Sequence, residues 1–318
     1  MTHCLCERIK GIVLGTISLL LLFPSLARAH NGAVALAYPV RGIVVDGDFS
    51  DWPEELPRFP IELPELGANP LDERDFKADL RAAYDPIENV LYFAIEVEDE
   101  SIVVDSSAAQ RWDSEDGCEV YLDPDHEEQS TATQFTYRGV GDGQRGAGDP
   151  ERKTAVRWHR QEGRHQYEWR LDLDGRIDLD EMGDGLSLSV DIVACDMDAD
   201  GSFSWMAWGR KIYKVGPADR RGDLILVRDP EQIGSVAGRV VWEGTGLGIA
   251  GTSLRLQAID NPRLWTRVVT TSGGHFRLDL PAGAYHLVAE LGSGEGISRQ
   301  VEVGAGDTVD LSIEVHPT

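Results

Sequence analysis

Three aspartates alternate along the segment Asp196-Met197-Asp198-Ala199-Asp200, and Gly201 follows them directly. Alternate carboxylates can converge on a hard cation such as calcium, and a glycine permits the turn that brings them together. An EF-hand loop that began at Asp196 would need a bidentate acid at its twelfth position, where this chain has Ala207. The spacing therefore excludes an EF-hand. It leaves two interpretations for Asp196, Asp198 and Asp200, a structural calcium site or a solvated turn.

A second set of polar side chains follows two stretches with a period of two. In 118–123 the alternation places Glu119, Tyr121 and Asp123 on the face opposite to the apolar side chains. In 134–138 the same alternation places three polar residues on one face, namely Gln134, Thr136 and Arg138. These polar faces either point to solvent or line a site.

The spacing of the reactive residues does not indicate catalysis. None of the eight histidines has a neighbour at a metal-ligand spacing, and the sequence contains neither a Gly-x-Ser-x-Gly motif nor a phosphate-binding loop. Acid pairs suited to glycoside hydrolysis are frequent in so acidic a chain, and nothing favours one pair over another. We therefore expect a protein that is not an enzyme and that requires no cofactor beyond the calcium considered above.

Short strands at regular intervals must position these side chains. Helical periodicity is nearly absent, and the period-two pattern predicts strands over 78–84, 92–97, 118–123, 134–138, 155–160, 166–173, 186–196, 205–208 and 223–227. Ile43–Val45 predicts a further strand that ends at Asp46-Gly47, where the glycine supplies a positive φ, and Trp52 then resembles a buried anchor. Trp158 and Trp169 are also predicted to lie in the core. The prolines between positions 53 and 70 predict a surface loop, because each removes a ladder donor.

Two all-β domains are predicted. An antiparallel β-sandwich is expected over 30–233, with a linker around Asp229-Pro230-Glu231. Residues 234–318 predict a smaller immunoglobulin-like, or transthyretin-like, β-sandwich with strands over 237–242, 253–258, 266–271, 275–280, 284–290, 298–303 and 308–315.

Residues 1–29 have the pattern of a secretory signal peptide. Arg8 and Lys10 precede an apolar stretch over 12–23, and Ala27-Arg28-Ala29 provides the small residues that signal peptidase needs. The apolar stretch is shorter than the ~20 residues that span a bilayer. We expect cleavage to leave His30 as the mature N-terminus of an exported protein, periplasmic or extracellular, with no membrane insertion.

Charge and cysteine content restrict the partners. With 55 acidic and 30 basic residues the net charge is −25, which opposes binding to phosphate backbones, so nucleic acid is not an expected partner. Cys4 and Cys6 leave with the signal segment, and Cys118 and Cys195 remain. These two form either a disulfide in an oxidising compartment or two separately buried thiols.

The order of several motifs resembles known families. In the first domain these are Val45-Asp46-Gly47 with Asp51-Trp52, Tyr84-Asp85 through Leu91-Tyr92, Trp112 ahead of Asp116 and 119–123, Gln134-Phe135, and Gly222-Asp223-Leu224. Over residues 38–228 the chain thereby resembles the family 9 carbohydrate-binding modules and their DOMON-like relatives. Through Gly238-Arg239-Val240, Ile249-Ala250-Gly251, Gly274-His275-Phe276 and 280–285, the second domain resembles carboxypeptidase-regulatory-like domains, a mostly structural family.

The first resemblance implies a site that holds a sugar at a chain end between two aromatic faces. Trp112 matches one wall, and for the other wall Tyr213 is preferred to Trp208. Glu119 and Gln134 match the residues that form hydrogen bonds to the sugar. Thr136 and Arg138 stand where the family carries an Arg and an Asn, so the sugar preference does not transfer. The implied function is an exported, non-catalytic carbohydrate-binding protein that assists polysaccharide breakdown.

Two alternatives remain open. Some DOMON-like sandwiches bind haem b through a Met with a His or Lys, and Met182, Met197 and Met206 lie near the appropriate end of the domain, although no histidine lies on an obviously facing strand. A structural envelope module that acts through protein contacts is the other alternative. In either case the C-terminal domain could dock a protein partner.

Overall fold

The computed structural model describes residues 30–107, 111–127, 129–138, 154–161, 163–173, 176–179, 182, 185–290 and 296–316. The signal-like segment 1–29 lies outside these residues, and 154–161 are described by their backbone only. Twelve strands form the first domain: β1 (Val34–Pro39), β2 (Phe59–Ile61), β3 (Leu63–Gly67), β4 (Lys77–Asp85), β5 (Val90–Glu98), β6 (Gly117–Asp123), β7 (Thr133–Arg138), β8 (Thr154–Gln161), β9 (Arg164–Asp172), β10 (Gly185–Met197), β11 (Phe203–Ala207) and β12 (Gly222–Val227).

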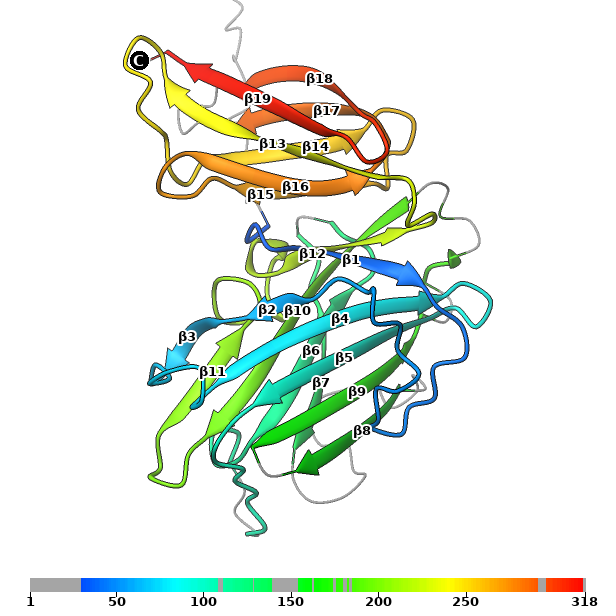
Figure 1. The fold of residues 1–318 in the computed structure, drawn as a ribbon, viewed down its shortest axis with the longest axis vertical. Coiled ribbons are helices and arrows are strands. Elements are labelled where there is room, and N and C mark those ends of the chain that lie inside the picture. The colour runs from blue at the N-terminus through cyan, green and yellow to red at the C-terminus, as the bar shows by residue number, and fades with distance from the viewer. Residues whose placement is uncertain are drawn as a thin grey trace, which may run out of the picture.

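The long strand β10 joins two packed layers (Figure 1). Its residues 185–190 pair with β12, which continues through β1, β4, β5, β9 and β8. Its C-terminal half pairs with β6 on one side and β11 on the other, and these lead to β7 and β3. Alternate side chains of the two layers meet in one apolar core, which includes Phe93, Val120 and Trp169. The predicted β-sandwich is confirmed.

Most pairings in the sandwich are antiparallel, as predicted, and β1 is the exception. It pairs in parallel with both β12 and β4. The strand predicted over Ile43–Val45 is wrong, since these residues belong to no strand and β1 precedes them in the chain. Side-chain carboxylates take up backbone donors here: the Val44 N–H donates to Asp51 Oδ2 (2.7 Å), and the N–H of the next residue but one, Asp46, donates to Glu168 Oε2 (2.8 Å).

The predicted Trp52 anchor is confirmed, because this side chain is only 3% exposed. Its indole N–H donates to Glu168 Oε1 (2.7 Å), while the other oxygen of Glu168 accepts the N–H of Gly47 (2.9 Å). Gly47 has the predicted positive φ, +89°. Burial raises the pKa of Glu168. Trp169 also lies in the core as predicted, and the side chain of Trp158 lies outside the described part.

The sequence predicts a surface loop for the proline-rich stretch. This prediction is wrong in part, because β2 and β3 lie within the stretch. Their prolines occupy positions that a sheet tolerates. β2 pairs with β4 over three residues, and β3 stands at one end of the strand order. Pro64 in β3 lies opposite Met206 of β11, next to an irregularity in the register.

The second domain contains seven strands: β13 (Ile233–Trp242), β14 (Ser253–Ala258), β15 (Trp265–Val269), β16 (His275–Pro281), β17 (Gly283–Glu290), β18 (Ile297–Val303) and β19 (Thr308–Val315). They form a three-stranded sheet, β16-β13-β19, and a four-stranded sheet, β15-β14-β17-β18. All seven predicted strands are present. The predicted smaller sandwich is confirmed, with β13 and β19 parallel.

In Figure 1, β15 of the second domain lies next to β1 and β12 of the first. The two domains share an apolar cluster at this junction. Leu36, Ile225 and Val227 of the first domain belong to the same buried cluster as the core of the second domain, which includes Leu264 and Leu287. Polar contacts add to this junction: the Ser187 N–H donates to the Arg263 carbonyl (3.1 Å), and the Asn261 side chain donates to the Gly185 carbonyl (2.7 Å). The second domain therefore covers apolar surface of the first.

The two remaining cysteines are free and buried. Cys118 on β6 pairs with Ala194 on β10, so Cys195 lies one position away and faces the opposite side of the sheet. Cys118 belongs to the inner core, whereas Cys195 belongs to a small cluster on the outer face with Trp205. Burial raises the pKa of both thiols. Of the two alternatives left by the sequence, the structure supports separate buried thiols.

Candidate functional site

A cavity of about 390 Å³ lies over the outer face of the layer that contains β6, β7 and β11. Its floor is polar and aromatic, with Glu119, Tyr121 and Gln134 beside Trp205. Leu66, Ile212 and Val215 add apolar lining. The volume falls in the range of pockets that hold small ligands, ~300–1,000 Å³.

Two large aromatic side chains on the cavity wall are exposed to solvent. Trp112 is 50% exposed and Tyr213 is 71% exposed. The Trp112 ring packs edge-on against Phe203, with ring centroids 5.3 Å apart, and the Trp112 carbonyl accepts a hydrogen bond from Arg138 Nη1. Exposed aromatic rings on the wall of a cavity are typical of a ligand-binding surface, because large aromatic side chains without a binding role are usually buried in the core.

Tyr213 stands on the loop between β11 and β12, and buried cations hold that loop in place. Tyr213 has a φ of +58°, an uncommon conformation for a residue with a large side chain. The next residue, Lys214, is 1% exposed and donates from Nζ to Asp191 Oδ2 (2.9 Å) and to the Gly209 carbonyl (2.6 Å). Burial lowers the pKa of Lys214.

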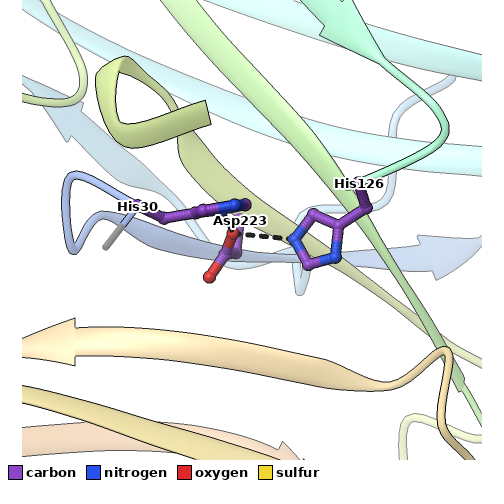
Figure 2. A group of neighbouring side chains, drawn as sticks. All are labelled: His30, His126 and Asp223. Atoms are coloured by element: carbon purple, nitrogen blue, oxygen red, sulfur yellow. Dashed lines mark hydrogen bonds and ion pairs between the residues drawn. The ribbon is translucent and has the colours of Figure 1, made fainter. Parts of the chain in front are cut away.

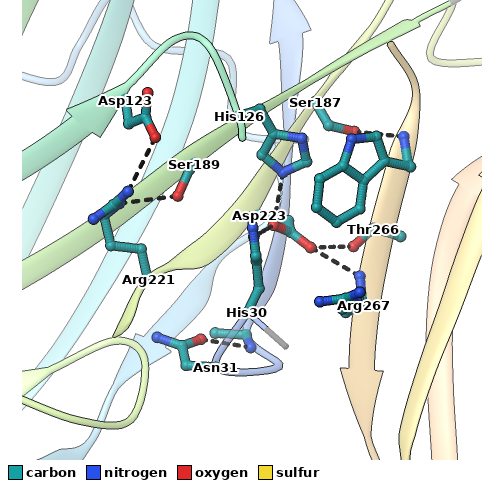
Figure 3. Close-up of polar contacts among 12 residues, drawn as sticks. His30, Asn31, Asp123, His126, Ser187, Ser189, Arg221, Asp223, Thr266 and Arg267 are labelled. Atoms are coloured by element: carbon teal, nitrogen blue, oxygen red, sulfur yellow. Dashed lines mark hydrogen bonds and ion pairs between the residues drawn. The ribbon is translucent and has the colours of Figure 1, made fainter. Parts of the chain in front are cut away.

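A second buried cation, Arg221, fixes the end of the same loop. Its Nη1 donates to the Lys214 carbonyl (2.8 Å), and its Nη2 donates to Asp123 Oδ2 (3.0 Å) at the end of β6 (Figure 3). The guanidinium carbon of Arg220 lies 5.8 Å from the centre of the Tyr213 ring. These contacts fix the backbone that carries Tyr213 to the sheet beneath it.

The polar groups of the floor form one network around Glu119. Its Oε2 accepts from the Tyr121 hydroxyl (2.6 Å) and from the Trp205 indole N–H (3.1 Å), and its Oε1 accepts from Arg138 Nη2. Gln134 Nε2 in turn donates to the Tyr121 hydroxyl (3.0 Å). Burial raises the pKa of Tyr121 well above its usual value. The network therefore presents a neutral phenol beside a paired carboxylate.

Four of the seven predicted sugar-site residues line this cavity: Trp112, Glu119, Gln134 and Tyr213. Arg138 lies beneath it, between Glu119 and Cys195 Sγ (3.3 Å). Thr136 is buried opposite Glu119 on the same face and does not line the cavity.

Trp208 does not line the cavity either, and its prediction as an alternative wall is wrong. It is 7% exposed and belongs to the inner core with Met206, while Trp205 and Ala207 belong to the outer face. Strand alternation explains this difference, since residues 205 and 208 differ by an odd number of positions. Trp205 and Tyr121 also line the cavity, although no pattern in the sequence indicates a role for them. The alternation placed Tyr121 on the correct face but gave no reason to assign it a role.

The three aspartates considered as either a calcium loop or a solvated turn do not form one group. Asp196 is buried with Asp99 and Asp116, whereas Asp198 lies with Asp75 and Glu100. Asp200 is exposed, and its carboxylate accepts the N–H and hydroxyl of Ser202, which closes a turn. Sequence spacing misses the first group, because its members come from the ends of β5 and β10 and the segment before β6.

Burial raises the pKa of Asp99 to about 7, that of Asp116 to about 8 and that of Asp196 to about 9. Both oxygens of Asp196 and Oδ2 of Asp99 are buried without a hydrogen-bond partner in the described part of the chain. Asp116 accepts the Val103 and Met197 N–H groups (2.7 Å each), which fixes its orientation. This donor set consists of hard oxygens only, as calcium prefers.

Two of the three methionines considered for haem binding occupy the apolar interior, and Met197 is half-buried. Met182 and Met206 are each 3% exposed and belong to the inner core. Met197 closes β10 and pairs with Phe203. Among the described residues, no helix is long and apolar enough to cross a membrane.

A β-sandwich with an aromatic cavity on one outer face defines a ligand-binding module of the all-β class. The family model described as "Carbohydrate family 9 binding domain-like" matches residues 45–227, and the model "Carboxypeptidase regulatory-like domain" matches residues 235–316. The first match spans more than half of the chain, so the chain belongs to the carbohydrate family 9 binding domain-like family.

Among solved structures, the chain is similar to a family 9 carbohydrate-binding module from Caldicellulosiruptor kristjanssonii in complex with cellotriose, at 14% identity and a TM-score of 0.49, over 63% of this chain and 96% of that one. The same module in complex with glucose gives 15% identity and a TM-score of 0.49, over 62% and 97%. A putative carbohydrate-binding protein from Bacteroides uniformis gives 11% identity and a TM-score of 0.40, over 61% and 99%. No curated protein matches this chain. Kinship with DOMON-like domains stays a prediction.

Proposed function

We propose that the chain is an exported, non-catalytic protein that binds the end of a carbohydrate chain in the cavity between Trp112 and Tyr213. The observation that carries this proposal is the pair of exposed aromatic walls on a cavity whose floor is a hydrogen-bonded polar network. Membership of the carbohydrate family 9 binding domain-like family supports it.

The two kinds of lining group have different roles in this proposal. The apolar C–H faces of a pyranose ring bury well against aromatic rings, which supplies affinity. The hydroxyls of the sugar need polar partners, and Gln134 and Glu119 lie on the cavity floor. A sugar that leaves one of these groups unpaired would lose ~1–3 kcal/mol, and this loss is the basis of discrimination.

Calorimetric titration and glycan arrays with the mature protein test the proposal. Trp112→Ala and Tyr213→Ala are each expected to weaken glycan binding by more than about 10-fold, from the loss of a stacking face worth about 1.4 kcal/mol or more. Trp242→Ala is the matched control, because Trp242 is 37% exposed but belongs to the second domain. Absence of binding to any glycan, or equal binding by wild type and Trp112→Ala, would contradict the proposal.

We also propose that calcium occupies the group Asp99, Asp116 and Asp196. The unpartnered oxygens of Asp196, which is 1% exposed, support this assignment, and the remaining ligands would be carbonyls or water. Calcium added after EGTA treatment is expected to raise the melting temperature. Asp196→Asn should abolish this effect, whereas Asp200→Asn, a change at the exposed neighbour, should preserve it. An identical response in both variants would refute the assignment.

Export and partner binding complete the proposal. Cleavage after Ala29 would leave His30 as the first residue, and the second domain would set the distance to, or dock, a protein partner in polysaccharide breakdown. N-terminal sequencing of the protein recovered outside the cytoplasm tests the cleavage. A first residue other than His30 would refute it.

A further inference from the structure

Three side chains from distant segments converge where the two domains meet. His30 precedes β1, His126 lies in the turn between β6 and β7, and Asp223 lies in β12 (Figure 2). Both histidines direct a ring nitrogen to the same oxygen, Asp223 Oδ1: His30 through Nδ1, and His126 through Nε2 at 2.9 Å. One ligand atom from each residue lies within 4.8 Å of the others. Two nitrogens and one carboxylate oxygen thus lie close enough together to hold one metal ion.

The surrounding residues hold this arrangement rigidly. The other oxygen of Asp223, Oδ2, accepts from the Thr266 hydroxyl (2.7 Å) and the Arg267 N–H (2.9 Å), so Oδ1 is left to the histidines (Figure 3). The Trp265 ring packs against both imidazoles, with centroids 4.9 Å from His30 and 4.1 Å from His126. Such outer contacts orient metal ligands in proteins.

Both imidazole rings are buried. The side chains of His30 and Asp223 have no exposed surface, and that of His126 is 4% exposed. The opposite ring nitrogens, His30 Nε2 and His126 Nδ1, have no hydrogen-bond partner among the described residues. His126 also has a φ of +54°, an uncommon backbone conformation that the fold maintains at this turn. Among the described residues, the hydrogen bonds of the two ring systems therefore converge on Asp223 Oδ1 alone.

His30 offers a further ligand through its position in the chain. Its nitrogen at the centre is Nδ1, the one nearer the backbone, and Nδ1 can chelate a metal together with the α-amine of the same residue. That amine is free only if the chain is cleaved after Ala29, so this ligand rests on the proposed export. The complete set would be three nitrogens and one oxygen.

We propose that His30, His126 and Asp223 form a mononuclear copper(II) site that joins the two domains. Imidazole and amine nitrogens with one carboxylate suit copper(II), whereas calcium and magnesium prefer oxygen ligands only. Among divalent first-row metals, a site of this composition binds copper most tightly. Because Thr266 and Arg267 of the second domain hold Asp223, the metal would also stabilise the junction.

The test uses the metal-free mature protein beginning at His30, titrated with copper sulfate in the absence of glycan. We expect one copper per chain, an electron paramagnetic resonance spectrum with nitrogen coupling, and a raised melting temperature. His126→Gln should lower the copper affinity by more than about 10-fold. His286→Gln is the matched control at an exposed histidine and should leave the affinity unchanged.

A chain with a short flexible extension before His30 keeps every side chain but turns the α-amine into a peptide amide. It should fold like the mature form, as judged by circular dichroism, and bind copper more weakly; equal affinity would overturn the role of the amine. No copper binding by the mature form, tighter binding of zinc than of copper, or equal binding by wild type and His126→Gln would overturn the site. None of these outcomes depends on glycan binding, so they are separate from failure of the carbohydrate proposal.

Discussion

Glu119 is central to the cavity floor, yet most of its hydrogen-bonding capacity is used within the protein. It is 5% exposed and accepts from Tyr121, Trp205 and Arg138. A carboxylate with these partners positions two aromatic side chains and neutralises a buried cation. We therefore interpret Glu119 as a residue that shapes the site, and Gln134 as the floor residue with more freedom to contact a ligand.

Glu119→Gln tests this interpretation. The amide keeps the shape but leaves the Arg138 charge without its counterion, which should lower the free energy of unfolding by about 3–5 kcal/mol. Denaturant unfolding followed by tryptophan fluorescence measures this change. Glu302→Gln, at an exposed position, is the control and should cost less than about 0.5 kcal/mol. Equal stability of the two variants would show that the Glu119 network is not needed for the fold.

The loop from β11 to β12 positions the second aromatic wall. The Tyr213 side chain is exposed, so its own packing does not fix its position. The position of Tyr213 depends on neighbouring residues, above all on the buried ion pair of Lys214 and Asp191. The pair links the loop to the middle of β10, and Arg221 links it to β6. The loop is therefore a supported part of the site.

Lys214→Met should show this support. Removal of the ammonium leaves Asp191 buried without its cation, which is expected to cost about 3–5 kcal/mol of stability and to weaken glycan binding through Tyr213. Lys211→Met is the matched control, because its salt bridge to Asp219 is half exposed and should contribute at most about 1 kcal/mol. Glycan affinity that is unchanged in folded Lys214→Met would mean that Tyr213 does not need this support.

The segment from Val40 to Pro53 is organised around Glu168 in a similar way. Trp52→Phe keeps an aromatic ring but removes the indole N–H that donates to Glu168 Oε1 (2.7 Å). We expect a loss of about 1–3 kcal/mol in the free energy of unfolding, because the acceptor stays buried. Chemical denaturation measures the loss, and Trp242→Phe on the second domain is the control. An equally small effect of both changes would contradict the anchoring role of the Trp52 N–H.

Most strands could be predicted from the sequence, but contacts between distant segments could not. Period-two alternation predicted every described strand except β1, β2 and β3, because successive side chains of a strand point to opposite faces, even where both faces are buried, as in β6 and β10. Ile43–Val45 has the composition of a strand, but the Val44 N–H donates to the Asp51 carboxylate, and the Asp46 N–H that follows donates to Glu168. Likewise, no local pattern could join Asp196 to Asp99, or His30 to His126, since tertiary structure alone brings these residues together.

The junction between the two domains is part of a continuous core. Leu36, Ile225 and Val227 face the second domain and belong to its buried cluster. Asp223 adds a polar connection, because one oxygen contacts two histidines of the first domain and the other contacts β15. The two imidazoles, against the opposing effect of burial, hold the pKa of Asp223 well below its usual range. The second domain thus buries the apolar side chains of β1 and β12 that face it.

A continuous core should make the two domains unfold together, and we expect one calorimetric transition for the mature wild-type chain. Leu264 is 2% exposed and lies close to Gly185, so it contacts the first domain from the second. Leu264→Ala should cost about 2–5 kcal/mol through the cavity that it leaves, and should begin to separate the transitions. Leu247→Ala, at a residue that is 65% exposed, is the control and should change little. Two well-separated transitions already in the wild type would contradict the coupling, because they would show that the shared cluster contributes too little free energy to make the domains one cooperative unit.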